Sequence, residues 1–408
     1  MKKYRILIAM AAVGIHICIG SVYAWSVLAK PVMQSMHITF SQTTLSFSIA
    51  IFFLGMSACI LGRFVEQIGP VKSGRLSAYC FSLGMIGTAA AIYFKSLLLL
   101  YIFYGFIGGI GLGVGYITPV STLIKWFPNH RGFATGLAIM GFGFASLIAG
   151  PVMQYLIEIY SLESMFMSMG ILYFLIIYSS SSCLRAPRIA DGIPALTTVI
   201  KQPKEGLPLS AERKQMTRKE AIRTWQFYAL WGIFFINITC GIGLLAVVSP
   251  MAQELVGMSS MEAASLVGVI GLVNGGGRIG WSSISDWIGR SRTYICFFLL
   301  QIIAFILLSF TRNIFLFQSL VFIIISCYGG GFSCMPAFIS DIFGVKQLSS
   351  IHGSILTAWG IAGIVGPVIL TFMKEITGSY MYTLQLFAGM LFIAFLTSLI
   401  LHREIVDE

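Results

Sequence analysis

Twelve long apolar stretches, separated by short polar connections, decide what this chain can fold into. They cover residues 6–28, 43–62, 76–94, 97–119, 132–155, 164–183, 225–249, 263–285, 293–311, 314–337, 351–373 and 380–401. Each stretch is close to the ~20 residues that cross the hydrocarbon core of a bilayer as an α-helix. A mean hydropathy of +0.89 with only 10% charged residues excludes a soluble globular enzyme. We therefore expect an all-α membrane protein of twelve transmembrane helices, because helices satisfy their own backbone hydrogen bonds in lipid.

Basic residues are distributed unequally between the two sides of the predicted membrane. The chain has 26 lysines and arginines, and with the N-terminus inside most of them fall on the cytoplasmic side. The exceptions are Arg278, which lies within a stretch, and four residues on the outer side: Lys30, Lys95, Arg312 and Lys374. This asymmetry predicts that both termini are cytoplasmic. The net charge of +11 then reflects membrane topology, and we expect the lipid bilayer rather than a nucleic acid as the partner of the basic loops.

The longest connection divides the chain into two halves. We expect an N-terminal six-helix bundle over residues 1–183, a cytoplasmic linker over 184–224 and a C-terminal six-helix bundle over 225–408. The rear of the linker is charged, which favours either a short helix on the membrane face or a plain solvated segment.

The two halves repeat each other. Gly62-x3-Glu66-x2-Gly69, after the second stretch, matches Ser282-x3-Asp286-x2-Gly289, after the eighth. Gly113-x5-Pro119 likewise matches Gly330-x5-Pro336. Duplicated halves of this kind predict two pseudo-symmetric bundles around an axis along the membrane normal, with a ligand site between them near the midplane.

Arg278 is the only charged residue inside any of the twelve stretches. A cation at this depth costs about 2.5–3.5 kcal/mol unless it is compensated. No Asp or Glu lies in a stretch, so a bound anion is the expected counter-charge, and the guanidinium fork fits a carboxylate bidentately. Two alternatives are snorkelling to the interface and a water-bridged link to Asp286, about 12 Å along the helix axis.

Other chemistry has little support in the sequence. The eight cysteines form no CxxC pair, and no nucleophile–base or metal-ligand constellation occurs. We expect no metal site, no cofactor and no enzymatic activity.

The loop sequences GRFVEQIGPVK (62–72) and SSISDWIGRSR (282–292) resemble the duplicated loop motif of the major facilitator superfamily. Glu66 replaces the Asp of that motif in the first copy, and Ser282 replaces its first Gly in the second. The resemblance implies that Glu66, Asp286 and Arg290 form a conformational gate on the cytoplasmic side, with the carboxylates near helix N-termini.

Within this superfamily the chain is similar to the oxalate–formate antiporter family, which includes bacterial lactate-type carriers. The similarity rests on Tyr23-Ala-Trp25-Ser26, on residues 235–254 and on Asn274-Gly-Gly-Gly-Arg278. It implies that Arg278 holds a substrate carboxylate, that Tyr116 and Tyr328 face the ligand, and that Lys374 and Tyr380, at the outer ends of the eleventh and twelfth helices, complete or gate the site. Trp25 and Trp359 are further candidates as apolar walls, and Asn274, in the same motif as Arg278, is a further candidate for substrate binding. Packing is an equal alternative for the aromatic residues, and Lys374 also fits an ordinary interfacial lysine.

The chain departs from oxalate carriers of that family, which have a lysine in the middle of the eleventh helix. Here no lysine occurs between Lys346 and Lys374. One central cation favours one carboxylate, since the second charge of a dicarboxylate would stay unpaired in a desolvated pocket.

These observations predict a secondary transporter that moves small monocarboxylates, such as lactate or pyruvate, by alternating access. An oxalate/formate-type exchanger and a non-transporting carboxylate sensor are the alternatives. The expected partners are the carboxylate and a proton or counter-anion. The resemblance further implies a monomer in the bacterial cytoplasmic (inner) membrane.

Overall fold

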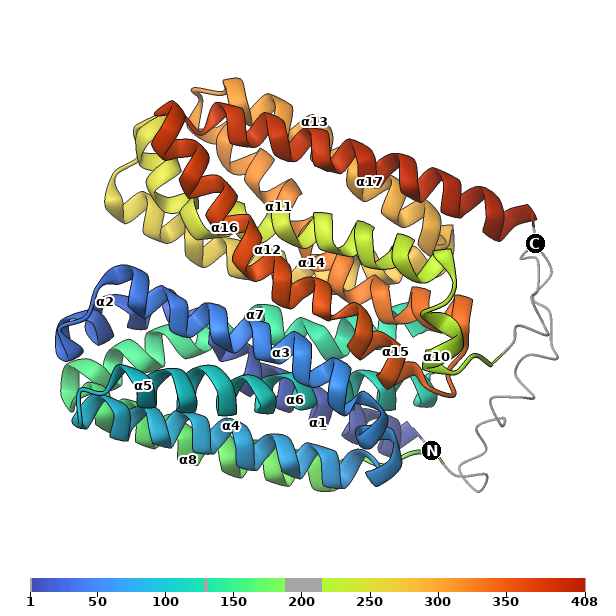
Figure 1. The fold of residues 1–408 in the computed structure, drawn as a ribbon, viewed down its shortest axis with the longest axis horizontal. Helices are drawn as coiled ribbons and strands as arrows, with labels where there is room; N and C mark the ends of the chain where they lie inside the picture. Colours follow the sequence, from blue (N-terminus) through green and yellow to red (C-terminus); the bar gives the residue numbers. More distant parts are fainter. Residues whose placement is uncertain (1, 128–130, 188–214, 408) are drawn as a thin grey trace.

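The computed structural model describes residues 2–127, 131–187 and 215–407. Figure 1 shows two helical bundles side by side, the N-terminal one below and the C-terminal one above. The N-terminal bundle comprises α1 (Lys2–Gly20), η1 (Ser21–Ala24), α2 (Trp25–Met36), α3 (Phe40–Ile68), α4 (Pro70–Tyr93), α5 (Leu97–Leu100), η2 (Tyr101–Ile107), α6 (Gly108–Trp126), α7 (Arg131–Ile159) and α8 (Leu162–Cys183).

The C-terminal bundle is preceded by a single helical turn, α10 (Arg218–Ala221). It comprises α11 (Trp225–Val256), α12 (Ser260–Ile288), α13 (Arg290–Phe310), α14 (Ile314–Phe343), α15 (Leu348–Ile355), α16 (Thr357–Thr377) and α17 (Met381–Asp407). The predicted short helix in the linker is thus one turn long, and most of that linker, 188–214, lies outside the described residues.

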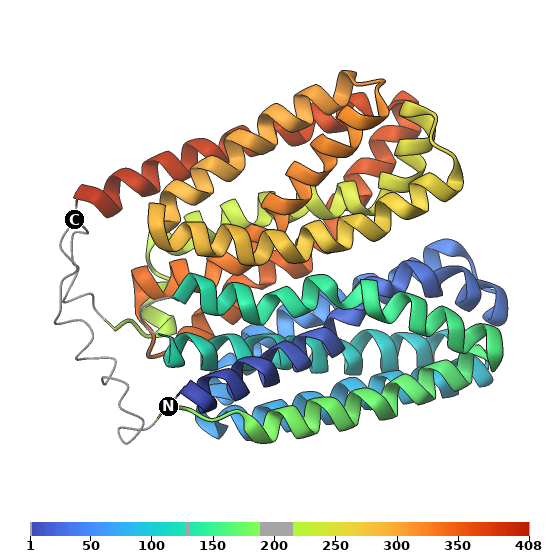
Figure 2. The ribbon, with the colours of Figure 1, turned by 180° about the vertical axis from the view of Figure 1, so that it is seen from behind.

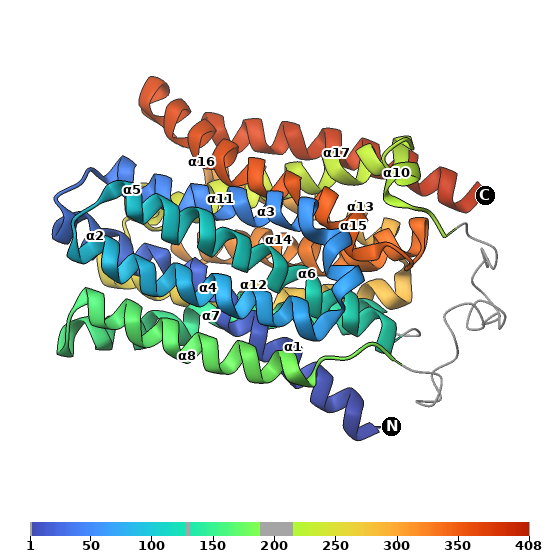
Figure 3. The ribbon, with the colours of Figure 1, turned by 60° about the horizontal axis from the view of Figure 1, so that its bottom comes forward.

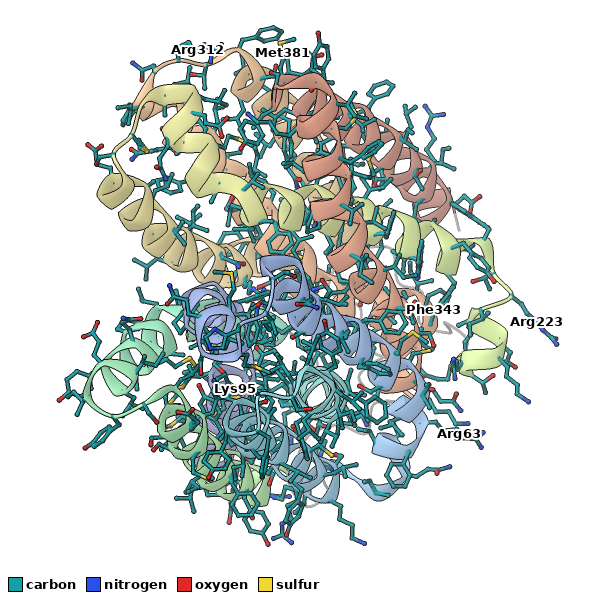
Figure 4. All side chains as sticks on the ribbon, turned by 60° about the vertical axis from the view of Figure 1, so that its left-hand side comes forward. Arg63, Lys95, Arg223, Arg312, Phe343 and Met381 are labelled. Atoms are coloured by element: carbon teal, nitrogen blue, oxygen red, sulfur yellow. The ribbon has the colours of Figure 1, made fainter. Side chains whose placement is uncertain are left out.

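Both ends of the chain lie at the same end of the bundles, which we call the termini end (Figures 1 and 3). Seen from behind, the two bundles come together at this end and diverge toward the opposite end (Figure 2). In Figure 4 the opposite end is turned forward, with Lys95 on the N-terminal bundle and Arg312 and Met381 on the C-terminal bundle. The topology prediction places the termini end in the cytoplasm.

The prediction of an all-α membrane protein is confirmed. Eleven spans among the described residues are long and apolar enough to cross a bilayer. The helix missing from that set is α12, which has 29 residues but carries Asn274 and Arg278 in its middle, and these lower its hydropathy. Large apolar side chains such as Ile60, Leu175 and Ile393 are exposed on the outer faces of the bundles, as contact with lipid requires.

Three predicted stretches are not continuous α-helices; among them, the fourth is divided by the π-helix η2 between α5 and α6. The first is divided by the 3-10 turn η1 between α1 and α2. The eleventh is divided at Leu356, between α15 and α16. The hydroxyl of Thr357 donates to the Ser354 carbonyl at 2.7 Å and accepts from Trp231 Nε1 at 2.9 Å. Tyr23 lies within the first interruption and Trp359 lies three residues after Leu356, and both rings face the contact between the bundles.

The last glycine of each duplicated loop motif ends a helix. Gly69 follows α3 with φ of 79°, and Gly289 follows α12 with φ of 91°. Side chains with a Cβ rarely adopt this left-handed region, whereas glycine does so without strain. The motif therefore repeats the same helix end in both halves, three residues after a carboxylate, Glu66 or Asp286.

Three pairs of elements form the main contact between the bundles: α7 with α12, α3 with α15, and α3 with α16. The backbones approach closely where glycines face each other. A Cβ on Gly143 of α7 would lie 2.7 Å from the Cα of Gly275 on α12. Small residues let helices pack this tightly in lipid, and here they bring α7 against Arg278.

Candidate functional site

Arg278 lies between the two bundles and is fully buried. Its Nε donates to Asn274 Oδ1 at 3.2 Å, one turn earlier on α12. Its Nη1 donates across the interface to the Ile139 carbonyl of α7 at 3.2 Å. The remaining nitrogen, Nη2, has no hydrogen-bond partner among the described residues. One face of a buried cation is thus left to bind something else.

Asp286 is not the counter-charge of Arg278. Its two carboxylate oxygens accept from the backbone N–H groups of Gly132, at 3.0 Å, and Phe133, at 2.9 Å. The same carboxylate forms an ion pair with Arg290. Within the described part of the chain no carboxylate contacts Arg278, and the guanidinium does not snorkel, because none of its surface is exposed.

Aromatic rings surround the guanidinium of Arg278. Its Cζ lies 5.6 Å from the ring centroid of Phe142 and 5.1 Å from that of Phe332. Trp359 packs edge-on against both rings, at centroid distances of 5.6 Å and 4.6 Å. We call the following set the aromatic box: Tyr23, Tyr116, Phe142, Tyr328, Phe332 and Trp359. The ring faces stabilise the cation by cation–π attraction while keeping the surroundings dry.

The aromatic box draws on both bundles. Tyr116 of α6 packs 5.3 Å from Trp359 of α16, centroid to centroid. The hydroxyls of Tyr23 and Tyr328 lie 3.2 Å apart, so a hydrogen bond joins η1 to α14. A ligand in the box would therefore touch both bundles at once, which is what a site that senses their relative position requires.

Two further hydrogen-bond donors in the aromatic box lack partners. Neither the hydroxyl of Tyr116 nor Nε1 of Trp359 has a hydrogen-bond partner in the described residues, although both side chains are fully buried. A buried donor without a partner typically costs about 1–3 kcal/mol. With Arg278 Nη2, the aromatic box and its arginine therefore contain three buried donors without a partner in the described residues, and donors of this kind suit the acceptor atoms of a small anion.

The structure brings together five of the predicted site residues and leaves three apart. Those brought together are Arg278, Asn274, Tyr116, Tyr328 and Trp359. Trp25 instead packs against Tyr104 at 4.2 Å within the N-terminal bundle. Lys374 and Tyr380 lie at the opposite end of the C-terminal bundle, where both contact Glu254.

Three members of the aromatic box were missed from the sequence: Tyr23, Phe142 and Phe332. Two of them directly adjoin glycines, in Gly141-Phe142-Gly143 and Gly330-Gly331-Phe332. Glycines next to a large aromatic residue allow the facing backbone to approach while the ring points into the interface. This pattern of glycine beside an aromatic residue could have identified Phe142 and Phe332 from the sequence.

The duplicated loop carboxylates connect the bundles at the termini end. Glu66, near the end of α3, accepts from the backbone N–H of Ser349 at 2.8 Å, in the first turn of α15. Asp286, near the end of α12, accepts from the first turn of α7 in the same way. Each carboxylate thus binds the N-terminus of a helix in the other bundle, where unpaired N–H groups and the helix dipole favour negative charge.

Arg290 strengthens only the second of these contacts. It binds Asp286 and also lies 3.3 Å from Asp341 of α14, within its own bundle. Its Nη1 donates to Ser285 Oγ at 2.6 Å. Arg290 therefore fixes the direction of the Asp286 side chain toward α7.

We expect Asp286→Asn to weaken closure of the termini end and to lower the transport rate about tenfold. The amide can accept one of the two backbone N–H groups but loses its charge and its pairing with Arg290, a loss of about 1.5–3 kcal/mol for hydrogen bonds to a charged group. Amide hydrogen exchange at the start of α7 should become faster in the variant. Ser285→Ala is the control, because it removes a partner of Arg290 within the C-terminal bundle and leaves both hydrogen bonds from α7 to Asp286 in place. Equal exchange at α7 in both variants would contradict the assignment.

Comparison with known proteins agrees with this architecture. The model of the Major Facilitator Superfamily matches residues 9–367 and 281–405. The oxalate:formate antiporter of Oxalobacter formigenes is 25% identical over 355 residues, covering 85% of this chain and 79% of that protein. The apicoplast pyruvate carrier 1 of Toxoplasma gondii is 23% identical over 459 aligned positions, covering 90% and 83%.

Among solved structures, the proton:xylose symporter XylE superposes with a TM-score of 0.75 at 16% identity, covering 97% of this chain and 95% of that one. This likeness concerns the fold: two bundles with the site between them. The family match spans most of the chain and includes the helices that carry the aromatic box and both loop motifs. The chain is therefore an integral membrane transport protein that belongs to the major facilitator superfamily.

Proposed function

We propose that this protein is a secondary transporter of small monocarboxylates such as lactate or pyruvate, with Arg278 holding the carboxylate. The observation that carries the proposal is the buried guanidinium whose Nη2 has no partner in the described residues. A carboxylate there would accept from Arg278 and from the unpartnered donors of Tyr116 and Trp359. Binding would then satisfy three buried groups at once, each of them costly to leave unpaired.

The charge of the site favours one carboxylate. Arg278 is the only basic side chain among the described residues of the aromatic box and its hydrogen-bond partners. The surrounding rings would leave the second charge of oxalate without a partner in a desolvated space. The two relatives named above act, by their names, on oxalate, formate or pyruvate, which are all small carboxylates.

The position of the site between the two bundles supports transport by alternating access. At the termini end Glu66 and Asp286 each bind the other bundle, so the site is closed off from that side. Release to that side requires these contacts to break while the bundles rock about the aromatic box. A bound carboxylate neutralises Arg278 and so lowers the charge carried through the bilayer core as the loaded protein reorients. We place the termini in the cytoplasm and the protein in the bacterial inner membrane, as a monomer.

An anion exchanger of the oxalate/formate type is the second candidate. It is favoured by the same arginine, since an empty carrier would have to reorient with an uncompensated cation, whereas exchange keeps the site filled. Exchange of one anion for another and symport with a proton differ in whether a pH gradient alone drives accumulation.

Uptake into proteoliposomes tests the proposal. We expect the purified chain to accumulate labelled lactate, and unlabelled pyruvate to compete with it. Oxalate should compete at least tenfold more weakly, the factor that corresponds to about 1.4 kcal/mol for an unpaired buried charge. Oxalate competing as well as pyruvate would favour the exchanger. Carboxylate binding without uptake of any anion would favour a sensor and reject transport.

A further inference from the structure

The end of the linker is bound to the C-terminal bundle just before α10. The side-chain oxygen of Gln215 accepts from the backbone N–H groups of Val345, at 3.0 Å, and Lys346, at 3.1 Å. The backbone N–H of Met216 donates to the Phe343 carbonyl at 3.0 Å. These contacts hold the linker against the connection between α14 and α15. This part of the linker is therefore docked on protein rather than free in solvent.

Arg218, the first residue of α10, extends from the linker to both bundles. Its backbone N–H donates to Gln347 Oε1 at 2.8 Å, and its Nε donates to Ser354 Oγ at 2.7 Å, both in the C-terminal bundle. Its Nη2 donates to Cys59 Sγ at 3.2 Å, on α3 of the N-terminal bundle. A guanidinium presents its donors in a rigid fork, so it can bind two partners at a defined spacing. One side chain of the linker thus joins α15 to α3.

The contact that Arg218 joins is tight. A Cβ on Gly353 of α15 would lie 1.9 Å from the Ala58 carbonyl oxygen of α3, so the two backbones touch beside Cys59. The Cys59 sulfur lies 3.8 Å from Ser354 Oγ. When the bundles move apart here, Arg218 has to release one of its two partners, because these partners lie on different bundles.

The two duplicated loop motifs differ at the position after their last glycine. The second copy has Arg290 there, and it pairs with Asp286. The first copy has Pro70 at the matching position, so no guanidinium from that position supports Glu66. Glu66 binds the first turn of α15, and Arg218 binds the same helix one turn further on. The linker thus supplies to the α3–α15 contact a guanidinium that the first motif lacks.

We infer that Arg218 is a positioning residue for closure of the termini end, because it holds α15 against α3 from the linker. The α3–α15 contact and the α7–α12 contact then each have one arginine, and the two arginines come from different parts of the chain. The linker takes part in the conformational change that alternating access requires, in addition to connecting the bundles. This inference goes beyond the proposed function and does not depend on which cargo is carried.

Arg218→Gln tests the inference by amide hydrogen exchange of the full chain in liposomes without added substrate. Glutamine cannot reach both Ser354 and Cys59, whereas the backbone bond to Gln347 remains. We expect exchange at the start of α15 and at the start of α7 to become about fivefold faster. A fivefold shift toward the open form corresponds to about 1 kcal/mol, the net contribution of one hydrogen bond. Unchanged exchange at α7, with or without faster exchange at α10 and α15, would overturn the inference, because Arg218 would then only anchor the linker.

Lys219→Gln is the matched control. Lys219 is the next residue of α10 and its side chain is exposed, so the variant removes the same charge and should leave exchange at α7 and α15 unchanged. An equal acceleration in this control would assign the effect to charge alone and would contradict the role of Arg218.

Cys59 variants test the partner on the other bundle. Cys59→Ala removes the acceptor, so it should accelerate exchange at α7, and adding Arg218→Gln to it should change exchange by less than about twofold. Cys59→Ser should behave like the unaltered protein, because a hydroxyl also accepts from a guanidinium. A full further acceleration by Arg218→Gln in the Cys59→Ala background would show that Arg218 does not act through Cys59. Because exchange is measured without cargo, failure of monocarboxylate uptake would reject the proposed function and leave this result in place.

Discussion

Replacing Arg278 by glutamine is expected to lower kcat/KM for lactate or pyruvate uptake at least a hundredfold. Removing one partner of a buried, hydrogen-bonded charge pair costs about 2–5 kcal/mol, and a hundredfold loss corresponds to about 2.7 kcal/mol. Glutamine keeps a polar side chain that can still donate to the Ile139 carbonyl, so the α7–α12 contact should persist. Uptake by the purified variant in proteoliposomes, compared at equal protein content, measures the effect.

Folding and transport must be separated in the Arg278 experiment. The variant should insert into the membrane like the unaltered protein. It should unfold at the same temperature or at a somewhat higher one, because it no longer buries an uncompensated cation in the bilayer core.

Tyr116→Phe provides a graded comparison: it removes one unpartnered hydroxyl and should raise KM about tenfold or less, without loss of the cation. Uptake by Arg278→Gln within a few-fold of the unaltered protein would show that the arginine does not bind the cargo.

Gly353→Ala is expected to block closure of the termini end and to reduce transport tenfold or more. A Cβ at this position of α15 would lie 1.9 Å from the Ala58 carbonyl oxygen and 2.5 Å from its carbon, both in the backbone of α3. Backbone atoms cannot rotate away as a side chain can, so the bundles would have to separate. Overpacking of this kind costs about 1–3 kcal/mol, and about 1.4 kcal/mol shifts the balance between closed and open forms tenfold.

Cys59 reports on the same contact. It follows Ala58 on α3, is partly exposed, and its sulfur contacts Ser354 and Arg218 across the interface. In a background that retains only this cysteine, Gly353→Ala should speed its reaction with a membrane-permeant maleimide. Gly232→Ala on α11 is the control, because a Cβ there meets nothing within 4 Å. Unchanged uptake and unchanged labelling in Gly353→Ala would disprove the tight contact.

The position of the membrane helices was readable from the sequence, since hydropathy over about 20 residues is a local property. Where helices are broken was not. Tyr23 and Trp25 are two residues apart, about 200° around an α-helix, so only one of them can face the centre. In the structure Tyr23, in the 3-10 turn η1, is the one that faces the centre; the sequence offered Trp25 as a wall of the site, with packing as an equal alternative. The position of Lys374 and Tyr380 at the outer ends of the eleventh and twelfth stretches was readable from the sequence, whereas their shared contact with Glu254 was not.

The isolation of Arg278 among apolar residues was visible in the sequence because charge is so costly in lipid that each exception is informative. The identity of the rings around it was not visible. Helices in this chain are apolar on nearly every side, and lipid-facing and core-facing residues are chemically alike, so no amphipathic stripe marks the inner face. Phe142 and Phe332 look like any of the 32 phenylalanines until packing places them over the guanidinium.

The sequence by itself determined that the chain crosses a membrane, that it is built from two related halves and that one cation lies among apolar residues, because hydropathy, repetition and charge are properties of residue order. Only the tertiary structure decided that Asp286 binds α7 and that no carboxylate of the described residues contacts Arg278. It also decided which aromatic residues surround that cation and that Glu254 holds Lys374. These facts depend on contacts between residues far apart in the chain, and such contacts are set by how the two bundles pack.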